Sequence, residues 1–260
     1  MTNHQVSSRI CKQAKKRLLQ MHYESNVGHL GGNLSCIDAL LVIFHEFLKG
    51  KAEFILSKGH SAGALYICLW SVGLISESTL ESFHKDETLL PGHPSANGIP
   101  KISFATGSLG HGLSLAAGLA LGIKLRRNSD AVFCLTSDGE WQEGSTWEAL
   151  IFAIHNNLTN LTIFVDHNEL QGFGTTSSVA SMTPLWEKLN GFAINTYVID
   201  GHNLDDIRTA INDAQSKLSI IFLRTIKGHG IEQLEGKLES HYLPLTQDQY
   251  NQALRNIDNA

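Results

Sequence analysis

The stretch Ala131-Val132-Phe133-Cys134-Leu135-Thr136-Ser137-Asp138-Gly139 opens the segment that decides the fold. Its apolar run ends in a tight turn that contains a carboxylate and a glycine, and a helical stretch follows. A second apolar run, 161–165, then leads into Asp166-His167-Asn168. The order strand, turn, helix, strand predicts a βαβ unit with parallel strands. Because open α/β sheets bind ligands at the carboxyl ends of parallel strands, we expect Asp138 and Asn168 to lie at one site.

The two polar residues after these runs also indicate a ligand. Asp138 offers a carboxylate and Asn168 an amide carbonyl. Hard oxygen ligands of this kind suit Mg²⁺ or Ca²⁺ that is shared with phosphate oxygens. The pair therefore predicts a metal ion that holds a diphosphate.

Hydrophobic periodicity extends the same architecture over the chain. Helical patterns cover residues 7–23, 34–48, 62–72, 113–127, 146–156 and 204–217. Short apolar runs at 54–56, 131–136, 161–165, 194–199 and 220–224 read as strands, and most lack alternation, which is typical of strands covered by helices on both faces. We expect one α/β domain over residues 1–260, with three α/β/α layers and a mainly parallel sheet. The irregular stretches 85–110 and 166–182 are long enough to be functional loops.

Bulk composition excludes several classes of protein. A formal net charge of −5 over 260 residues and a pI near 6.2 give no field that would gather nucleic acid or an anionic membrane surface. Residues 1–17 are charged and resemble neither a signal peptide nor a membrane span. The four cysteines form no CxxC pair and lie in apolar surroundings, as buried free thiols do in a reducing compartment. A cytoplasmic location is therefore expected.

The chain has 13 histidines, a high number. Six of them directly follow glycine, where a loop or turn is expected: His29, His60, His93, His111, His202 and His229. None of these pairs has the HxxxH or HxH spacing of a zinc site, so no zinc is expected.

Two further segments have both a functional and an ordinary interpretation. The glycine-rich turn 106–112 leads into a helix, where backbone amides can face an anion, although such turns are common before helices. Lys58 and His60 follow a predicted strand and could reach a phosphate. The alternative is a solvated lysine beside a helix cap.

An acidic pair, Glu143 and Glu148, lies at the start of the helix that follows the Asp138 turn. Acidic residues in a first turn stabilise the helix dipole, which is the ordinary interpretation. A buried pair would instead be a candidate proton relay. Sequence spacing leaves both possibilities open.

The order of these segments resembles the N-terminal half of transketolase over residues 5–245. The motifs that carry the resemblance are Gly28-His29, Leu56-Ser57-Lys58-Gly59-His60, Gly92-His93-Pro94, Thr106-Gly107-Ser108-Leu109-Gly110, Asp138-Gly139-Glu140, Gln142-Glu143-Gly144, Trp147-Glu148-Ala149, Asn168 and Thr225-Ile226-Lys227-Gly228. Several ordered motifs are far more specific than any one of them.

The resemblance implies a thiamine diphosphate-binding fold, the PP domain, and a role for each matching residue. Asp138, Asn168 and the Leu170 carbonyl would hold Mg²⁺ or Ca²⁺. The cofactor-binding residues would be Lys58, His60, Gly107, Ser108, Leu109, Asp138, Gly139, Glu140, Asn168 and Lys227. The catalytic residues would be the channel histidines His29, His60, His93 and His241, together with Glu143 and Glu148, which link two cofactor sites across a subunit interface.

The resemblance also implies what lies on another chain. The family's cofactor-activating glutamate belongs to the Pyr domain, and we expect the Pyr and C-terminal domains on a separate partner. The chain would then be the first subunit of a split transketolase, inactive alone and active as an α2β2 heterotetramer. Its substrates would be a sugar or sugar phosphate, and its reaction the transfer of a two-carbon ketol unit from a ketose to an aldose.

Local departures from the family pattern suggest a specialised donor or acceptor sugar. Ser137 replaces a glycine, and His111 replaces a glutamine. The string 240–244 reads Ser-His-Tyr-Leu-Pro instead of Trp-His-Gly-Lys-Pro, so Leu243 replaces a lysine on the substrate side. Two alternatives stay open: a component of another thiamine diphosphate enzyme, of the deoxyxylulose phosphate synthase or 2-oxo acid decarboxylating kind, and a non-catalytic regulatory paralogue.

Overall fold

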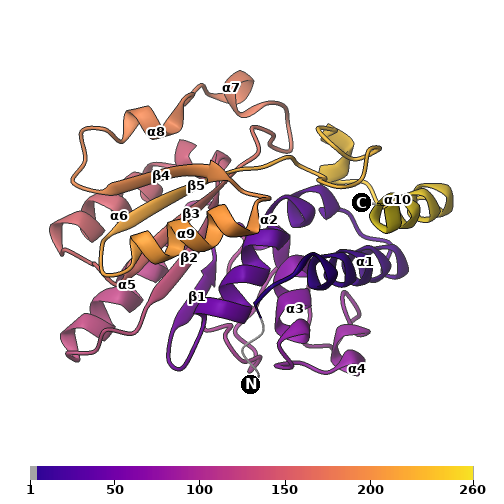
Figure 1. The fold of residues 1–260 in the computed structure, drawn as a ribbon, viewed down its shortest axis with the longest axis horizontal. Coiled ribbons are helices and arrows are strands. Elements are labelled where there is room, and N and C mark those ends of the chain that lie inside the picture. Colours follow the sequence, from indigo (N-terminus) through magenta and orange to yellow (C-terminus); the bar gives the residue numbers. More distant parts are fainter. Residues whose placement is uncertain (1–4, 260) are drawn as a thin grey trace.

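The computed structural model describes residues 5–259 and is built around one parallel sheet (Figure 1). Its strands pair in the order β1-β2-β3-β5-β4, all parallel. Their bounds are β1 Glu53–Leu56, β2 Val132–Ser137, β3 Leu161–His167, β4 Asn195–Asp200 and β5 Ser219–Arg224. The five predicted strands and the mainly parallel sheet are confirmed.

Helices cover the two faces of the sheet (Figure 1). The first layer contains α1 Ser8–Glu24, α2 Leu30–Val42, α3 Ala62–Ser71, α9 Leu204–Ala214 and α10 Gln247–Asn259, and the second contains α5 Gly112–Leu125 and α6 Gly144–His155. The short helices are α4 Glu77–Leu80, α7 Thr176–Val179 and α8 Leu185–Lys188. Single turns of other helix types are η1 Ile43–Phe47, η2 Gly59–Ser61, η3 Gly139–Gln142 and η4 Leu238–His241.

The core consists of two apolar clusters, one on each face of the sheet. Every residue of β2 and β3 is buried, which explains why their sequences are apolar without alternation. The expectation of covered strands is wrong for β4, where exposed and half-buried residues alternate. This strand lies at the edge of the sheet, beside β5 alone.

Helix α2 differs from its predicted bounds. It begins at Leu30, four residues before the predicted start, and continues into the π-helical turn η1. The combined segment Leu30–Phe47 is long and apolar enough to cross a membrane, but 83% of it is buried inside the domain. Its packing against α1, α3 and α9 identifies it as a core helix.

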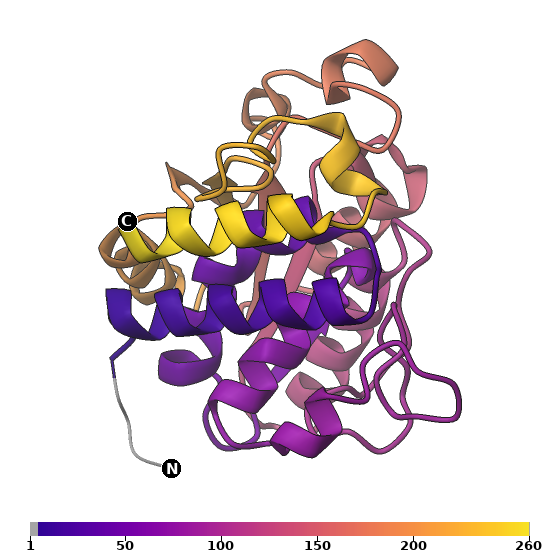
Figure 2. The same cartoon turned by 90° about the vertical axis from the view of Figure 1, so that its right-hand side faces the viewer.

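Helix α10 was missed by the sequence analysis. It lies side by side with α1 (Figure 2). Ala253 and Ile257 of α10 are buried, and Tyr250 stacks on Tyr23 of α1 with ring centroids 4.3 Å apart. The apolar positions Tyr250, Ala253, Leu254 and Ile257 repeat at helical spacing, so the sequence does contain the signal for this helix.

The four cysteines, Cys11, Cys36, Cys68 and Cys134, are buried and free, as the sequence predicts. Burial raises the pKa of the Cys11 thiol to about 12. These thiols are apolar core residues rather than reactive groups.

A buried histidine, His22, joins α1 to α3. Its Nδ1 lies 3.0 Å from the Gly28 carbonyl, its ring packs against Phe83, and a Cβ at Gly63 would come within 2.4 Å of Nε2. Within residues 5–259 this Nε2 has no hydrogen-bond partner. Burial lowers the pKa of His22 from 6.5 to about 4, so the neutral ring is the folded form near neutral pH.

We predict a pH dependence of stability from this residue. Because the folded pKa is depressed, the stabilisation by neutral His22 is complete above pH 6.5 and is lost as the pH falls towards 4. From pH 7 to 4, the free energy of unfolding of the wild type should fall by roughly 3 kcal/mol more than that of His22→Asn, measured with urea. Substitution of exposed His155 by Asn is the control and should keep the wild-type slope. Parallel curves for wild type and His22→Asn would contradict the prediction.

Candidate functional site

The carboxyl ends of β2 and β3 bring the two predicted metal ligands to one edge of the sheet. Ser137 pairs with Asp166, so Asp138 and Asn168 follow neighbouring strands at the same level. The Asp138 carboxylate accepts hydrogen bonds from the Gly139 amide, at 2.8 Å, and from the Glu169 amide, at 2.7 Å. The Asp138 turn and the 168–175 loop are therefore held together by one buried side chain.

The chemistry of this site fits a divalent cation. Burial and the nearby Asp166 charge raise the pKa of Asp138, and a cation bound at this carboxylate would oppose that rise. The Asn168 amide nitrogen donates to Asp166, while its oxygen lies on the opposite side of the amide and accepts from the Leu170 amide at 3.1 Å. With the Leu170 carbonyl, the donor set is three hard oxygens, as Mg²⁺ and Ca²⁺ prefer.

A buried ion pair lies beneath the site. Lys58 and Asp166 are both fully buried, and the Lys58 ammonium donates to Asp166 and, at 3.0 Å, to the Gly32 carbonyl. Burial alone would lower the pKa of Lys58, but the facing Asp166 carboxylate outweighs it and raises that pKa. The alternative of a solvated Lys58 is wrong. Its role as a cofactor contact stays a prediction, because its ammonium binds protein atoms.

Asp166 is a central residue that sequence reasoning missed. Besides Lys58, its carboxylate accepts hydrogen bonds from Ser35, Asn168 and Thr225, which come from α2, the loop after β3 and the loop after β5. The signal available in the sequence was its place at the end of a buried strand, next to Asn168. A charged residue there needs a buried partner.

Glu140 is also buried and joins three segments through hydrogen bonds. Its carboxylate accepts hydrogen bonds from the Ser57 hydroxyl, the Ser137 amide at 2.8 Å and the Gly110 amide at 3.0 Å. Burial raises the pKa of Glu140, and the hydrogen bonds oppose that rise. Its carboxylate thus lies beneath the turns after β1 and β2, and its predicted cofactor contact stays untested.

The glycine-rich turn approaches the β1 turn closely. A Cβ on Gly59 would come within 2.7 Å of the Gly107 amide nitrogen, and Gly107 itself has φ 145°, so neither position tolerates a larger residue without a shift. Ser108 and Leu109 at the tip are exposed. The Gly139 amide already donates to Asp138 and the Gly110 amide to Glu140, so an anion at this edge would meet the other amides of the glycine-rich turn.

Four histidines from separate segments form one cluster beside this edge. The ring centroid of His29 lies 5.9 Å from that of His60, 6.0 Å from His93 and 5.1 Å from His241. His60 and His241 are 5.4 Å apart. The structure thus gathers the four predicted channel histidines, although they span more than 200 positions of the sequence.

The cluster is neutral at physiological pH. Burial lowers the pKa of His29, His60 and His93, and burial with the neighbouring Lys227 charge lowers the pKa of His241 to about 3. Neutral imidazoles can both donate and accept hydrogen bonds. His29 has left-handed backbone angles, φ 65° and ψ 7°, which is uncommon for a residue with a side chain and is typical of functional sites.

Lys227 connects the histidine cluster with the predicted metal ligands. Its ammonium lies 3.1 Å from the Leu170 carbonyl, 3.3 Å from the Gln171 carbonyl and 2.9 Å from His241 Nδ1. Burial and Lys58 lower the pKa of Lys227 to about 8. A buried cation at this point would favour a bound anion.

Glu143 and Glu148 lie at the start of α6, apart from the histidine cluster, and both are exposed in this chain. The hypothesis that the two carboxylates form a pair buried within the chain is therefore wrong. Their role at a subunit interface stays a prediction. His111, the residue that departs from the family pattern, is also exposed.

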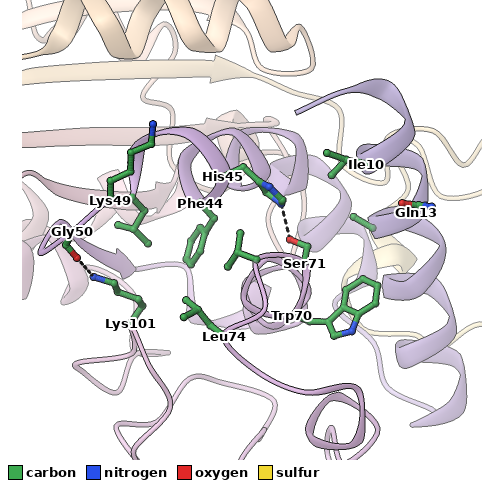
Figure 3. A pocket seen from close by; sticks show the side chains of 13 residues that line it. Ile10, Gln13, Phe44, His45, Lys49, Gly50, Trp70, Ser71, Leu74 and Lys101 are labelled. Atoms are coloured by element: carbon green, nitrogen blue, oxygen red, sulfur yellow. Dashed lines mark hydrogen bonds between the residues drawn. The ribbon is translucent and has the colours of Figure 1, made fainter. Parts of the chain in front are cut away.

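Two other features lie outside this site. A cavity of about 980 Å³ lies between α1, η1 and the end of α3, near Phe44, Trp70 and Lys101, and none of the site residues lines it (Figure 3). Asp38, His202 and His229 each place a ligand atom within 4.8 Å of the others.

The Asp38–His202–His229 group has protein partners already. The Asp38 carboxylate binds the Lys15 ammonium at 2.8 Å and His202 Nδ1 at 3.0 Å. His202 Nε2 accepts from the Ile226 amide at 2.9 Å. The group thus fixes the chain next to Lys227, and its wide spacing in the sequence explains why a search for HxxxH spacing could not find it.

Taken together, parallel strand ends with hard oxygen ligands, glycine turns and a buried lysine define an α/β domain that binds a cofactor diphosphate. Residues 11–257 match the family model of the transketolase thiamine diphosphate binding domain, and the chain belongs to that family.

Named relatives and a solved structure agree with this assignment. The chain is 34% identical to the 6-deoxy-6-sulfo-D-fructose transketolase subunit of Clostridium sp. (strain MSTE9), over 94% of this chain and 93% of the relative. It is 32% identical to an apulose-4-phosphate transketolase subunit of Phocaeicola vulgatus, over 94% and 90%. The transketolase structure from Campylobacter jejuni superposes with a TM-score of 0.85 at 25% identity, over 97% of this chain and 43% of that one.

We predict that the Lys58–Asp166 pair is required for stability. Lys58→Met should lower the free energy of unfolding by about 3–5 kcal/mol, because it leaves a buried carboxylate without its cation. Adding Asp166→Asn to Lys58→Met should restore part of that loss, since the amide is neutral. Guanidinium titrations measure both, with exposed Lys188→Met as the control. Additive losses in the double variant would contradict the ion-pair interpretation.

Proposed function

We propose that this chain is the diphosphate-binding subunit of a two-chain transketolase. With its partner it transfers a two-carbon ketol unit from a ketose or ketose phosphate to an aldose or aldose phosphate. The observation that carries the proposal is the neutral four-histidine cluster beside Asp138, Asn168 and Lys227. The histidines would bind sugar hydroxyls, and the other three residues would anchor the diphosphate.

The anchor is assigned to residues at the strand ends. Asp138, Asn168 and the Leu170 carbonyl would hold Mg²⁺ against the diphosphate, and Lys227 would neutralise charge on the same side. Amides of the glycine-rich turn 106–112 would donate to phosphate oxygens. When bound, thiamine diphosphate supplies an electron sink for the carbanion that C–C cleavage leaves.

The histidines would act on the sugar. Their depressed pKa values keep them neutral near pH 7, so each ring has one nitrogen that donates a hydrogen bond and one that accepts. Lys227 donates to His241 Nδ1, so the Nε2 of this ring carries its proton. His241 would therefore act as a hydrogen-bond donor to an oxygen atom of the substrate.

A partner chain would cover part of the surface of this one. Helix α6 exposes Ile151 by 55% and Phe152 by 42% beside Glu143 and Glu148, and Phe173 near the site is 85% exposed. Large apolar groups exposed near a functional site are characteristic of interaction surfaces. We assign residues 1–260 to one PP domain, with the Pyr and C-terminal domains on the partner, in an α2β2 assembly.

The relatives support a specialised sugar and a separate partner. Two of them are named as transketolase subunits, one for 6-deoxy-6-sulfo-D-fructose and one for apulose-4-phosphate, and they match this chain over almost its whole length. We assign the chain to the cytoplasm because its four cysteines are buried free thiols.

The test is cofactor binding and turnover with a C-terminal transketolase subunit from the same organism. Asp138→Asn keeps the shape of the side chain but removes the charge that would hold the metal. Calorimetric titration of the complex with thiamine diphosphate and Mg²⁺ should show affinity weakened at least about tenfold, or about 1.4 kcal/mol. Ketol transfer should be lost with it.

Exposed Asp213→Asn on α9 is the matched control and should bind and turn over as the wild type does. Full activity of the isolated chain would overturn the split site. Release of CO₂ from pyruvate would favour another thiamine diphosphate enzyme. Absence of binding in the wild-type complex would favour a non-catalytic paralogue.

A further inference from the structure

The aromatic ring of Tyr242 forms one side of the histidine cluster. Its edge lies against His241, with ring centroids 4.4 Å apart and an interplanar angle of 81°, and its centroid is 6.1 Å from that of His29. The backbone at this point packs tightly, since a Cβ on Gly28 would come within 2.2 Å of the Tyr242 carbonyl oxygen. The ring position is therefore fixed by the same contacts that place the histidines.

The Tyr242 hydroxyl reaches across to the loop after β3. A Cβ on Gly172 would lie 2.2 Å from this hydroxyl oxygen, so the absence of a side chain at Gly172 makes room for it. The tyrosine is 51% exposed, and within the described residues its hydroxyl has no hydrogen-bond partner. An oriented hydroxyl beside neutral imidazoles is available to a polar ligand.

The cation that contacts the histidine cluster is already engaged by protein atoms. The three donors of the Lys227 ammonium are directed at Leu170, Gln171 and His241. Leu243 is 58% exposed and apolar, and Glu239, one turn earlier, adds negative charge. A phosphate group that passes Tyr242 would therefore gain no attraction from the next residue, Leu243, whereas an uncharged carbon chain with hydroxyls would find an aromatic face and a hydrogen-bonding group.

We propose that Tyr242 determines sugar specificity: its ring limits the width of the site, and its hydroxyl binds a hydroxyl of the aldose beyond the reacting aldehyde. The neutral edge formed by Tyr242 and Leu243 selects an aldose that is not phosphorylated where it passes this edge. This inference rests on the proposed ketol transfer.

The experiment uses hydroxypyruvate as donor and the complex that the chain forms with its C-terminal partner. Hydroxypyruvate delivers the ketol unit while its carboxylate leaves as CO₂, so transfer does not reverse. The acceptors are glycolaldehyde, which has a single hydroxyl beside its aldehyde, then ribose and ribose 5-phosphate. The variants are Tyr242→Phe, which removes only the hydroxyl, and Leu243→Lys, with Tyr250→Phe on α10 as the matched control.

Tyr242→Phe should raise the KM for ribose about 3- to 10-fold with little change in kcat, as the loss of one neutral hydrogen bond implies. Its kinetics with glycolaldehyde should stay at the wild-type level. Leu243→Lys should raise the ratio of kcat/KM for ribose 5-phosphate over ribose at least about threefold. Tyr250→Phe should change none of these values.

The outcomes separate the two proposals. If the wild-type complex transfers ketol units but Tyr242→Phe leaves the KM for ribose unchanged, or lowers the rates with glycolaldehyde equally, the specificity role is wrong and the tyrosine is structural. If the wild-type complex yields no product with any acceptor, the proposed function is wrong and this inference fails with it.

Discussion

One buried carboxylate, Asp166, organises the functional edge of the sheet. It pairs with Lys58 after β1 and accepts hydrogen bonds from Ser35 and Thr225, so it joins α2, β1, β3 and β5 at one point. A charge removed from water is costly unless it is paired and hydrogen-bonded on all sides, and here every partner comes from a different element. The fold supplies the hydrogen bonds and the positive charge that the buried carboxylate needs. The carboxylate in turn fixes the turns that contain Asn168 and lead to Lys227.

Much of the fold follows from local sequence. Runs such as 132–136 and 161–165 are apolar except for one threonine each, because both faces of β2 and β3 are covered. Helix α10 escaped the prediction although Tyr250, Ala253, Leu254 and Ile257 repeat at helical spacing along its buried face. The exposure of β4 was also not predicted, because a strand's place at the sheet edge is decided by strand order and not by its own residues.

The site residues also fall into those that local sequence predicts and those that it does not. Asp138 and Asn168 could be predicted because each follows its own strand, and the histidine motifs could be predicted from their order along the chain. The burial of Lys58 could not, because its partner Asp166 lies 108 positions away. Glu140 reads as one more acid in a polar turn, and only the folded chain shows three donors from separate segments converging on it. Burial of polar groups depends on tertiary contacts that no local pattern contains.

The left-handed backbone at His29 has an evolutionary consequence. A side chain in this conformation costs about 1–2 kcal/mol relative to glycine, and Gly28, immediately before it, shows that glycine is in use in the same turn. Folding alone would favour glycine at position 29, whereas the imidazole there is the ring that contacts His60, His93 and His241. Selection for stability and selection for chemistry therefore oppose each other at this position, so drift towards glycine would mark a chain that has kept its fold and lost its reaction.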